Sequence, residues 1–73
     1  MTIRQLINHI SFDLKESVLE VFRKGDEIFN NSKLNKYEIT LDEVLQKKIK
    51  TDFFVHKDTK HYGNKDVLSV DII

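Results

Sequence analysis

Three histidines are the side chains of this sequence best suited to acid–base or metal chemistry at neutral pH. They are His9, His56 and His61. The carboxylates nearest to the last two along the chain are Asp52, Asp58 and Asp66. A metal site built on one helix or strand would space its histidines as H-x-x-x-H or H-x-H, and neither spacing occurs. We therefore expect solvated surface histidines, with His9 near the end of a helix, and neither a metal nor another cofactor.

The groups that nucleophilic or phosphate chemistry needs lack their usual context. The chain has no cysteine, which excludes disulfides, thiolate catalysis and Cys-based zinc sites. No serine lies in a G-x-S-x-G turn, and Gly25 and Gly63 are the only glycines, so a glycine-rich phosphate loop is excluded. A chain of 73 residues has little room for a pocket that shields a reaction from water. We expect a protein that is not an enzyme.

Lysines gather in residues 47–65, among two of the histidines and a tyrosine. The candidate nucleic-acid contacts are Lys47, Lys48, Lys50, Lys57, Lys60, Tyr62 and Lys65. Basic groups beside aromatic rings can hold phosphates and stack on bases. The alternative is that these lysines face solvent and keep edge strands from pairing. We favour the alternative, because no nucleic-acid-binding motif accompanies the lysines and the net charge of the chain is zero.

Two helix starts stand out among the elements that must position these side chains. Thr2 and Gln5 have the spacing of a capping box, and Thr40 and Glu43 repeat it. Apolar residues follow each box at helical spacing. We predict one helix that ends near residues 9–11, and a second whose inward face runs over residues 41–49.

Four segments rich in β-branched and aromatic residues predict strands, over residues 17–23, 27–31, 51–57 and 67–72. A turn at residues 24–26 joins the first pair, and a polar loop over residues 58–66 joins the second. The expected fold is a single α+β domain over residues 1–73, in the order αββαββ. Its four-stranded antiparallel sheet would carry both helices on one face. Residues 1–32 and 38–73 would then be two helix–hairpin units, which a degenerate duplication would explain.

Apolar side chains on both faces of two predicted strands indicate an interaction surface. Val18 and Phe22 alternate with the apolar face of their strand, and the adjacent Phe53 and Phe54 point to opposite faces. Some of these side chains must lie on the face that the helices leave open. Such a patch is typical of a partner or dimer interface, the alternative being a loop folded over it. The candidate protein interface is Val18, Phe22, Phe53 and Phe54.

The composition fits a globular protein rather than a disordered or membrane-spanning one. Hydrophobic residues make up 40% of the chain and charged residues 33%. No apolar run approaches membrane-spanning length. The first ten residues are apolar on one side only, unlike a signal peptide. We expect a cytoplasmic protein with no membrane contact.

The segments Met1–Ile7, Ser11–Asp13 and Leu41–Leu45 resemble small phage- or prophage-encoded accessory proteins of Gram-positive bacteria. The Lys-, Asn- and Ile-rich composition is similar to that of proteins from AT-rich genomes. This resemblance implies an accessory protein that acts by binding a host or phage protein, and inhibition of a host defence system is one such role. It carries no functional residue over. The sequence thus predicts a non-catalytic protein-binding module, with homodimer formation as one possibility and nucleic-acid binding as the alternative.

Overall fold

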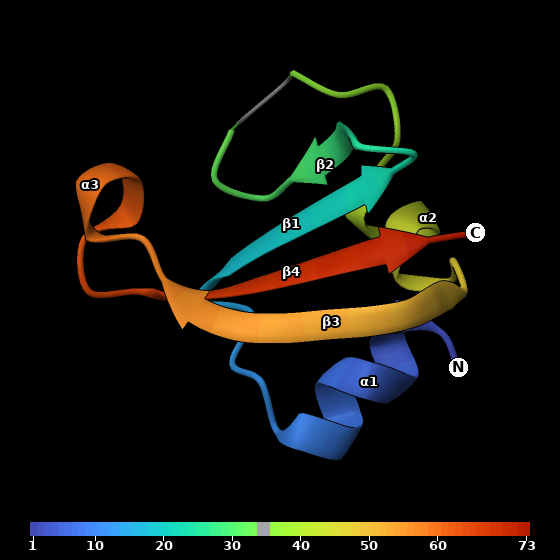
Figure 1. The fold of residues 1–73 in the computed structure, drawn as a ribbon, viewed down its shortest axis with the longest axis horizontal. Helices are drawn as coiled ribbons and strands as arrows, with labels where there is room; N and C mark the ends of the chain where they lie inside the picture. Colours follow the sequence, from blue (N-terminus) through green and yellow to red (C-terminus); the bar gives the residue numbers. More distant parts are fainter. Residues whose placement is uncertain (34–35) are drawn as a thin grey trace.

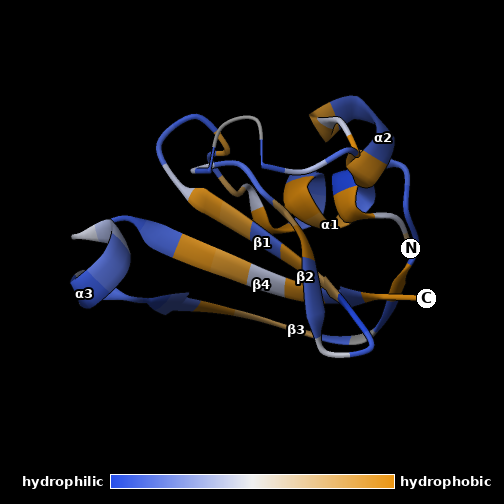
Figure 2. Ribbon diagram, turned by 90° about the horizontal axis from the view of Figure 1, so that it is seen from above, coloured by the Kyte–Doolittle hydropathy of each residue, from blue (hydrophilic) through white to orange (hydrophobic). Residues whose placement is uncertain are grey.

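Two layers make up the fold: a four-stranded sheet and two helices that cover one of its faces (Figures 1 and 2). The computed structural model describes residues 1–33 and 36–73, leaving aside the side chain of Thr51. The elements follow the order α1 (Ile3–Ile10), β1 (Val18–Arg23), β2 (Asp26–Asn30), α2 (Leu41–Leu45), β3 (Ile49–Lys57), α3 (Thr59–Tyr62) and β4 (Asp66–Ile72). The α+β class and the four predicted strands are confirmed.

The sheet is mixed, with the strand order β2-β1-β4-β3. Each hairpin is antiparallel, as predicted, but β1 and β4 pair in parallel from Val18↔Val67 to Phe22↔Asp71. The prediction of an all-antiparallel sheet is therefore wrong at its centre. A short turn forces neighbouring strands to be antiparallel, whereas the long connection between β1 and β4 leaves their direction free. The most apolar strand of each pair then takes a central position, where parallel pairing is common.

A helix of four residues, α3, lies within the polar loop predicted over residues 58–66. Asp58 caps it, because its carboxylate accepts a hydrogen bond from the backbone N of His61 at 3.2 Å. Gly63 follows with φ of 66° and ends the turn. The observed order is therefore αββαβαβ, not αββαββ.

Helix α2 is shorter than predicted, and Ile49 belongs to β3. The reason is that the N-terminal segment forms hydrogen bonds with the backbone of Lys47 and Ile49. Ile3 N donates to Lys47 O at 3.0 Å, and Ile49 N donates to Met1 O at 2.9 Å. The capping threonines behave as predicted: Thr2 forms the complete capping box, and the Thr40 side chain accepts from Glu43 N.

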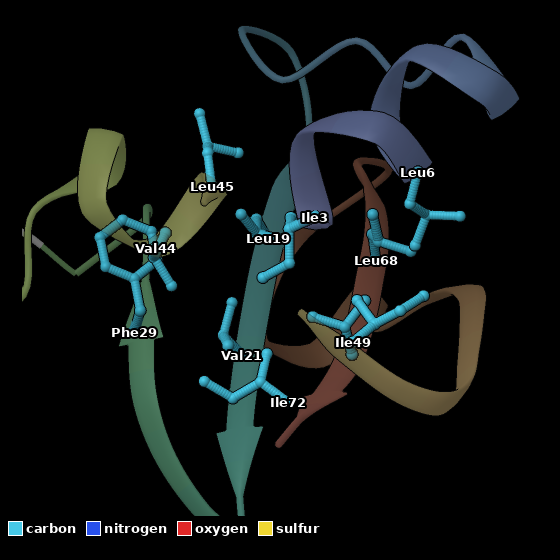
Figure 3. Close-up of a cluster of buried hydrophobic side chains, with 11 residues drawn as sticks. Ile3, Leu6, Leu19, Val21, Phe29, Val44, Leu45, Ile49, Leu68 and Ile72 are labelled. Carbon is cyan, nitrogen blue, oxygen red and sulfur yellow. The ribbon is translucent and has the colours of Figure 1, made fainter. Parts of the chain in front are cut away.

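The core lies between the helices and one face of the sheet (Figure 3). Alternate residues of the central strands supply the floor, and both helices supply the cover. Its buried members are Ile3, Leu6, Leu19, Val21, Phe29, Val44, Leu45, Ile49, Leu68, Val70 and Ile72. Because Leu19 and Leu68 point toward the helices, the intervening Glu20 and Ser69 point to the other side. We call this helix-free side the open face.

The open face and the edge of strand β3

The four residues predicted as a protein interface do not form one patch. Val18 is on the open face but is 1% exposed, where it shares a hollow with Ser32 and Tyr62, so it offers no surface to a partner. Phe22 is half-buried on the same face. Phe53 and Phe54 do reach solvent, with 40% and 59% of their area exposed. Val18 thus fails as an interface residue because chain segments outside β1 cover its end of the sheet.

Strand β3 forms one edge of the sheet and exposes three consecutive apolar residues. Phe53, Phe54 and Val55 are 40%, 59% and 48% exposed. Phe53 and Val55 pair with Val70 and Leu68, on the helix side, whereas Phe54 pairs with Ser69 on the open face. We call the outer side of residues 52–57 the β3 edge. No backbone hydrogen bond from elsewhere in the described chain reaches it, since the N-terminal segment stops at its bridge to Lys48.

The opposite edge of the sheet, formed by β2, is partly covered. The Tyr37 ring lies 6.2 Å from the Phe29 ring, and the Tyr37 hydroxyl donates a hydrogen bond to Glu27 Oε1. The chain that follows β2 therefore returns along this edge (Figure 1). An incoming strand has freer access to the β3 edge than to β2.

A polar network centred on Glu20 occupies the open face. Ser69 Oγ donates to Glu20 Oε1 at 2.8 Å, and the hydroxyl of Tyr62 donates to Glu20 Oε2 at 3.1 Å. His56 Nε2 lies 2.9 Å from Ser69 Oγ. Because the single hydroxyl proton of Ser69 goes to Glu20, His56 Nε2 must carry a hydrogen and donate it. In a catalytic triad the serine gives its proton to the imidazole instead, so this arrangement does not activate Ser69 as a nucleophile.

The network continues from Tyr62 to Glu27 through Asn30, which is 1% exposed. Asn30 Nδ2 donates to the Tyr62 hydroxyl at 2.9 Å and to Glu27 Oε2 at 3.3 Å. Glu27 also receives Lys33 Nζ at 2.8 Å. Burial raises the pKa of Glu27, but its hydrogen bonds from Lys33, Tyr37 and Asn30 outweigh burial and hold the pKa below its usual value. The network therefore ties α3 to both β1 and β2.

Two hollows flank Glu20 on the open face. One, of about 680 Å³, lies toward α3 and is lined by acids and lysines together, among them Asp58, Lys33 and Lys65. The other, of about 230 Å³, lies beside the β3 edge, where Asp52, Phe54 and His56 share its lining. Two charged side chains that line the first hollow already have partners: Lys33 binds Glu27, and Asp58 binds His61. The first hollow therefore has lining charges of both signs, whereas the second is lined by the carboxylates of Glu20, Asp52 and Asp71 and by the imidazole of His56.

The predicted nucleic-acid contacts are distributed over opposite ends of the molecule. Lys47 and Lys48 lie just before β3 begins, whereas Lys60 lies in α3 and Lys65 follows α3, beyond the other end of β3 (Figure 1). A strand of nine residues spans roughly 26–30 Å. Lys57 Nζ binds Asp66 and the Asn64 carbonyl, at 3.2 and 2.9 Å. The Tyr62 hydroxyl is engaged by Glu20 and Asn30, so these residues do not make one basic surface around an available ring.

The histidines differ from one another in their surroundings. His9 is exposed on α1, and His61 is exposed beside Asp58, at 3.0 Å between Nδ1 and Oδ2. The hydrogen bond from the His61 side chain lowers the pKa of Asp58. His56 is not the solvated side chain that we predicted, since it is half-buried against Ser69 and its ring lies 4.7 Å from that of Phe54. Within the described residues, no three histidine, aspartate or glutamate side chains are placed to hold a metal ion.

The sequence did not predict Glu20, Ser69 and Asn30 as members of a polar network. Glu20 and Ser69 each interrupt an apolar strand, and Asn30 ends another. Glu20 and Ser69 share a signal, which is a polar residue at an alternate position of a central strand, on the face away from the core. This signal becomes specific only once β1 and β4 are known to be neighbours, with Glu20 paired to Ser69.

Helices long and apolar enough to cross a membrane are absent from the described part of the chain. Comparison with known proteins found no matching family model, no matching curated protein and no matching solved structure.

Proposed function

We propose that this chain is a small, non-catalytic protein-binding module that receives a partner strand along the β3 edge. The observation that supports this proposal is the run Phe53-Phe54-Val55, exposed on an edge strand with a free outer side. An edge strand presents unpaired N–H and C=O groups, and an added strand satisfies them. Main-chain bonds then supply affinity, and side chains on alternate faces supply specificity.

The apolar side chains give a partner strand something to bury on both faces. Phe54 would be covered on the open face, and Phe53 and Val55 on the helix side. Burying one large apolar side chain contributes about 1.5–3 kcal/mol. Lys50 and Lys57 border the run at either end and favour pairing confined to the segment between them.

The resemblance to phage accessory proteins adds the class of partner to this proposal. The partner would be a host or phage protein with an available strand, and inhibition of a host defence protein is one such role. The cytoplasm, where such a partner resides, is the expected location.

The test is a pull-down from bacterial lysate with matched variants. Phe54→Lys places a charge in the middle of the β3 edge, and Ile73→Lys places one at an apolar side chain that is 75% exposed and lies outside β3. We expect the native chain and Ile73→Lys to enrich the same protein, and Phe54→Lys to lose it. Circular dichroism checks that both variants fold.

Nuclease treatment of the lysate separates the proposal from its alternative. Enrichment that is equal in all three proteins contradicts binding at the β3 edge. Enrichment that disappears with nuclease, and falls steeply with added salt, supports nucleic-acid binding through the lysines instead.

A further inference from the structure

The β3 edge reads almost the same from both directions when it is centred on Phe54. The chain Asp52-Phe53-Phe54-Val55-His56 has apolar residues at its three central positions and a carboxylate and an imidazole at its ends. Asp52, Phe54 and His56 line one hollow on the open face, so these alternate residues share a side of the sheet. Phe53 and Val55 share the other side.

Two copies of an edge strand can pair antiparallel only around a two-fold axis normal to the sheet. Such an axis keeps each face of one copy level with the same face of the other. A residue can therefore lie opposite only a residue of its own face. Near the middle of the β3 edge this leaves three registers, in which Phe53, Phe54 or Val55 lies opposite itself.

In the register centred on Phe54, the residues of positions 52–56 lie opposite residues of compatible chemistry. Phe54 meets Phe54 of the second copy, Phe53 meets Val55 twice on the helix side, and Asp52 meets His56 twice on the open face. Apolar pairs across strands each contribute roughly 0.2–1 kcal/mol beyond alanine pairs. Each Asp52 carboxylate lies opposite an imidazole rather than opposite a second carboxylate, so no like charges face each other in this register.

The other arrangements place charged or polar side chains opposite apolar ones, or like charges side by side. Centring on Phe53 places Asp52 opposite Phe54, and centring on Val55 places Phe54 opposite His56 and Phe53 opposite Lys57. A parallel, in-register pair would place Asp52 beside Asp52 and Lys57 beside Lys57, and like charges directly opposite are destabilising.

We propose that the occupant of the β3 edge is a second copy of this chain, paired antiparallel with Phe54 on the two-fold axis. This inference rests on the proposed use of the β3 edge for strand addition, and a host or phage strand that binds there would displace the second copy. The two sheets become one continuous sheet with all helices on the same side. The hollows beside the β3 edge then lie next to each other across the axis.

The absence of cysteine from the native chain permits a clean test of this register. Residues opposite each other in antiparallel strands have Cα atoms about 4.5–5.5 Å apart, within the range of a disulfide. The first measurement is the sedimentation mass of the native chain, expected at twice 8.7 kDa. The second is oxidative cross-linking of Phe54→Cys, with Ile73→Cys as the control for random collision.

Phe53→Cys and Val55→Cys form a second pair of variants, which keep Phe54 in place. We expect Phe54→Cys to cross-link to itself well above Ile73→Cys. Phe53→Cys mixed with Val55→Cys should cross-link more than either variant alone. A dimer in which neither pattern appears overturns the register.

A native chain that stays monomeric overturns self-pairing. The pull-down then decides separately whether a monomeric chain still uses the β3 edge to bind another protein. If Phe54→Lys still loses its captured protein, strand addition stands and the second copy is the wrong occupant. If capture is the same for all variants, the use of the β3 edge itself is wrong.

Discussion

Replacing Asn30 with aspartate should destabilise the protein more than any other single-atom change in the polar network. Four hydrogen bonds meet at this side chain. Oδ1 accepts from the N and Oγ of Ser32 at 2.9 and 2.7 Å, and Nδ2 donates to Tyr62 and Glu27 at 2.9 and 3.3 Å. A carboxylate keeps the two bonds to Ser32 and loses both bonds that the amide donates.

The cost has two parts. The two lost hydrogen bonds account for about 1 kcal/mol each. The new carboxylate also faces Glu27 Oε2, and two like charges about 4 Å apart repel by about 4 kcal/mol at an effective dielectric constant of about 20. Because the Glu27 side chain is 18% exposed and can turn toward water, we expect about half of that repulsion to remain. Asn30→Asp should therefore lower the free energy of unfolding by roughly 3–5 kcal/mol at pH 7.

The effect has a defined pH dependence. Burial and the Glu27 charge raise the pKa of the introduced carboxyl in the folded state above its unfolded value of about 4. The repulsion part of the cost is thus absent below that value, grows as the pH rises toward the folded-state pKa, and is complete above it. Asn30→Ala loses all four hydrogen bonds but adds no charge, so its cost of about 4 kcal/mol should not rise with pH.

Urea denaturation followed by circular dichroism measures these free energies at pH 7 and at pH values down to 4. Asn64→Asp, at an exposed turn residue, is the matched control and should stay within about 0.5 kcal/mol of the native chain. If Asn30→Asp is no more destabilising than Asn64→Asp at pH 7, Asn30 does not occupy the buried, fully bonded position described above.

Three further changes probe other parts of the molecule. Glu27→Gln should lower the free energy of unfolding by about 1–2 kcal/mol at pH 7. Because the folded-state pKa of Glu27 is lowered, the stabilisation by its carboxylate is present above the unfolded pKa and is lost as the pH falls, so the native and variant stabilities should converge in acid. A difference in urea melts that does not change with pH would contradict this. Gly25→Ala should cost about 1 kcal/mol in thermal melts, because φ is +83° and no atom lies within 4 Å of the added methyl, so the strain is in the backbone alone; Gly25→Asn should cost less, and an equal cost for both would implicate another cause. Ser69→Ala should remove the acceptor for His56 Nε2–H. We expect ¹⁵N spectra of the native imidazole to show hydrogen on Nε2, and spectra of the variant to show a mixture of tautomers. An unchanged spectrum would contradict the orientation of the Ser69 hydroxyl.

Local signals predicted the elements well. The Thr2 capping box marks the start of α1, and Lys24-Gly25 marks the turn between β1 and β2, because both depend on residues within a few positions of each other. Helix α3 was missed because four residues are too few for an apolar period, although Asp58 is an ordinary N-cap. The end of α2 was missed because its cause, the N-terminal segment bonded to Lys47, is distant in the sequence.

The candidate site could be predicted only in part, for the same reason. Phe53 and Phe54 were identified from their types and adjacency, and both are exposed on β3. That β3 is an edge strand depends on the parallel pairing of β1 with β4, which no local pattern encodes. The polar network likewise requires Glu20 and Ser69 to become neighbours through that pairing.

The parallel ladder at the centre of the sheet also bears on how the chain reaches this structure. Glu20 and Ser69 are 49 positions apart, whereas the partners within each hairpin are close in sequence. Closing the longer loop costs more chain entropy, so the two hairpins should form first and dock later. Until they dock, the inner edges of β1 and β4 are exposed and can pair with other chains. Refolding should therefore slow and lose yield as the protein concentration rises, even under conditions in which the native protein stays in solution.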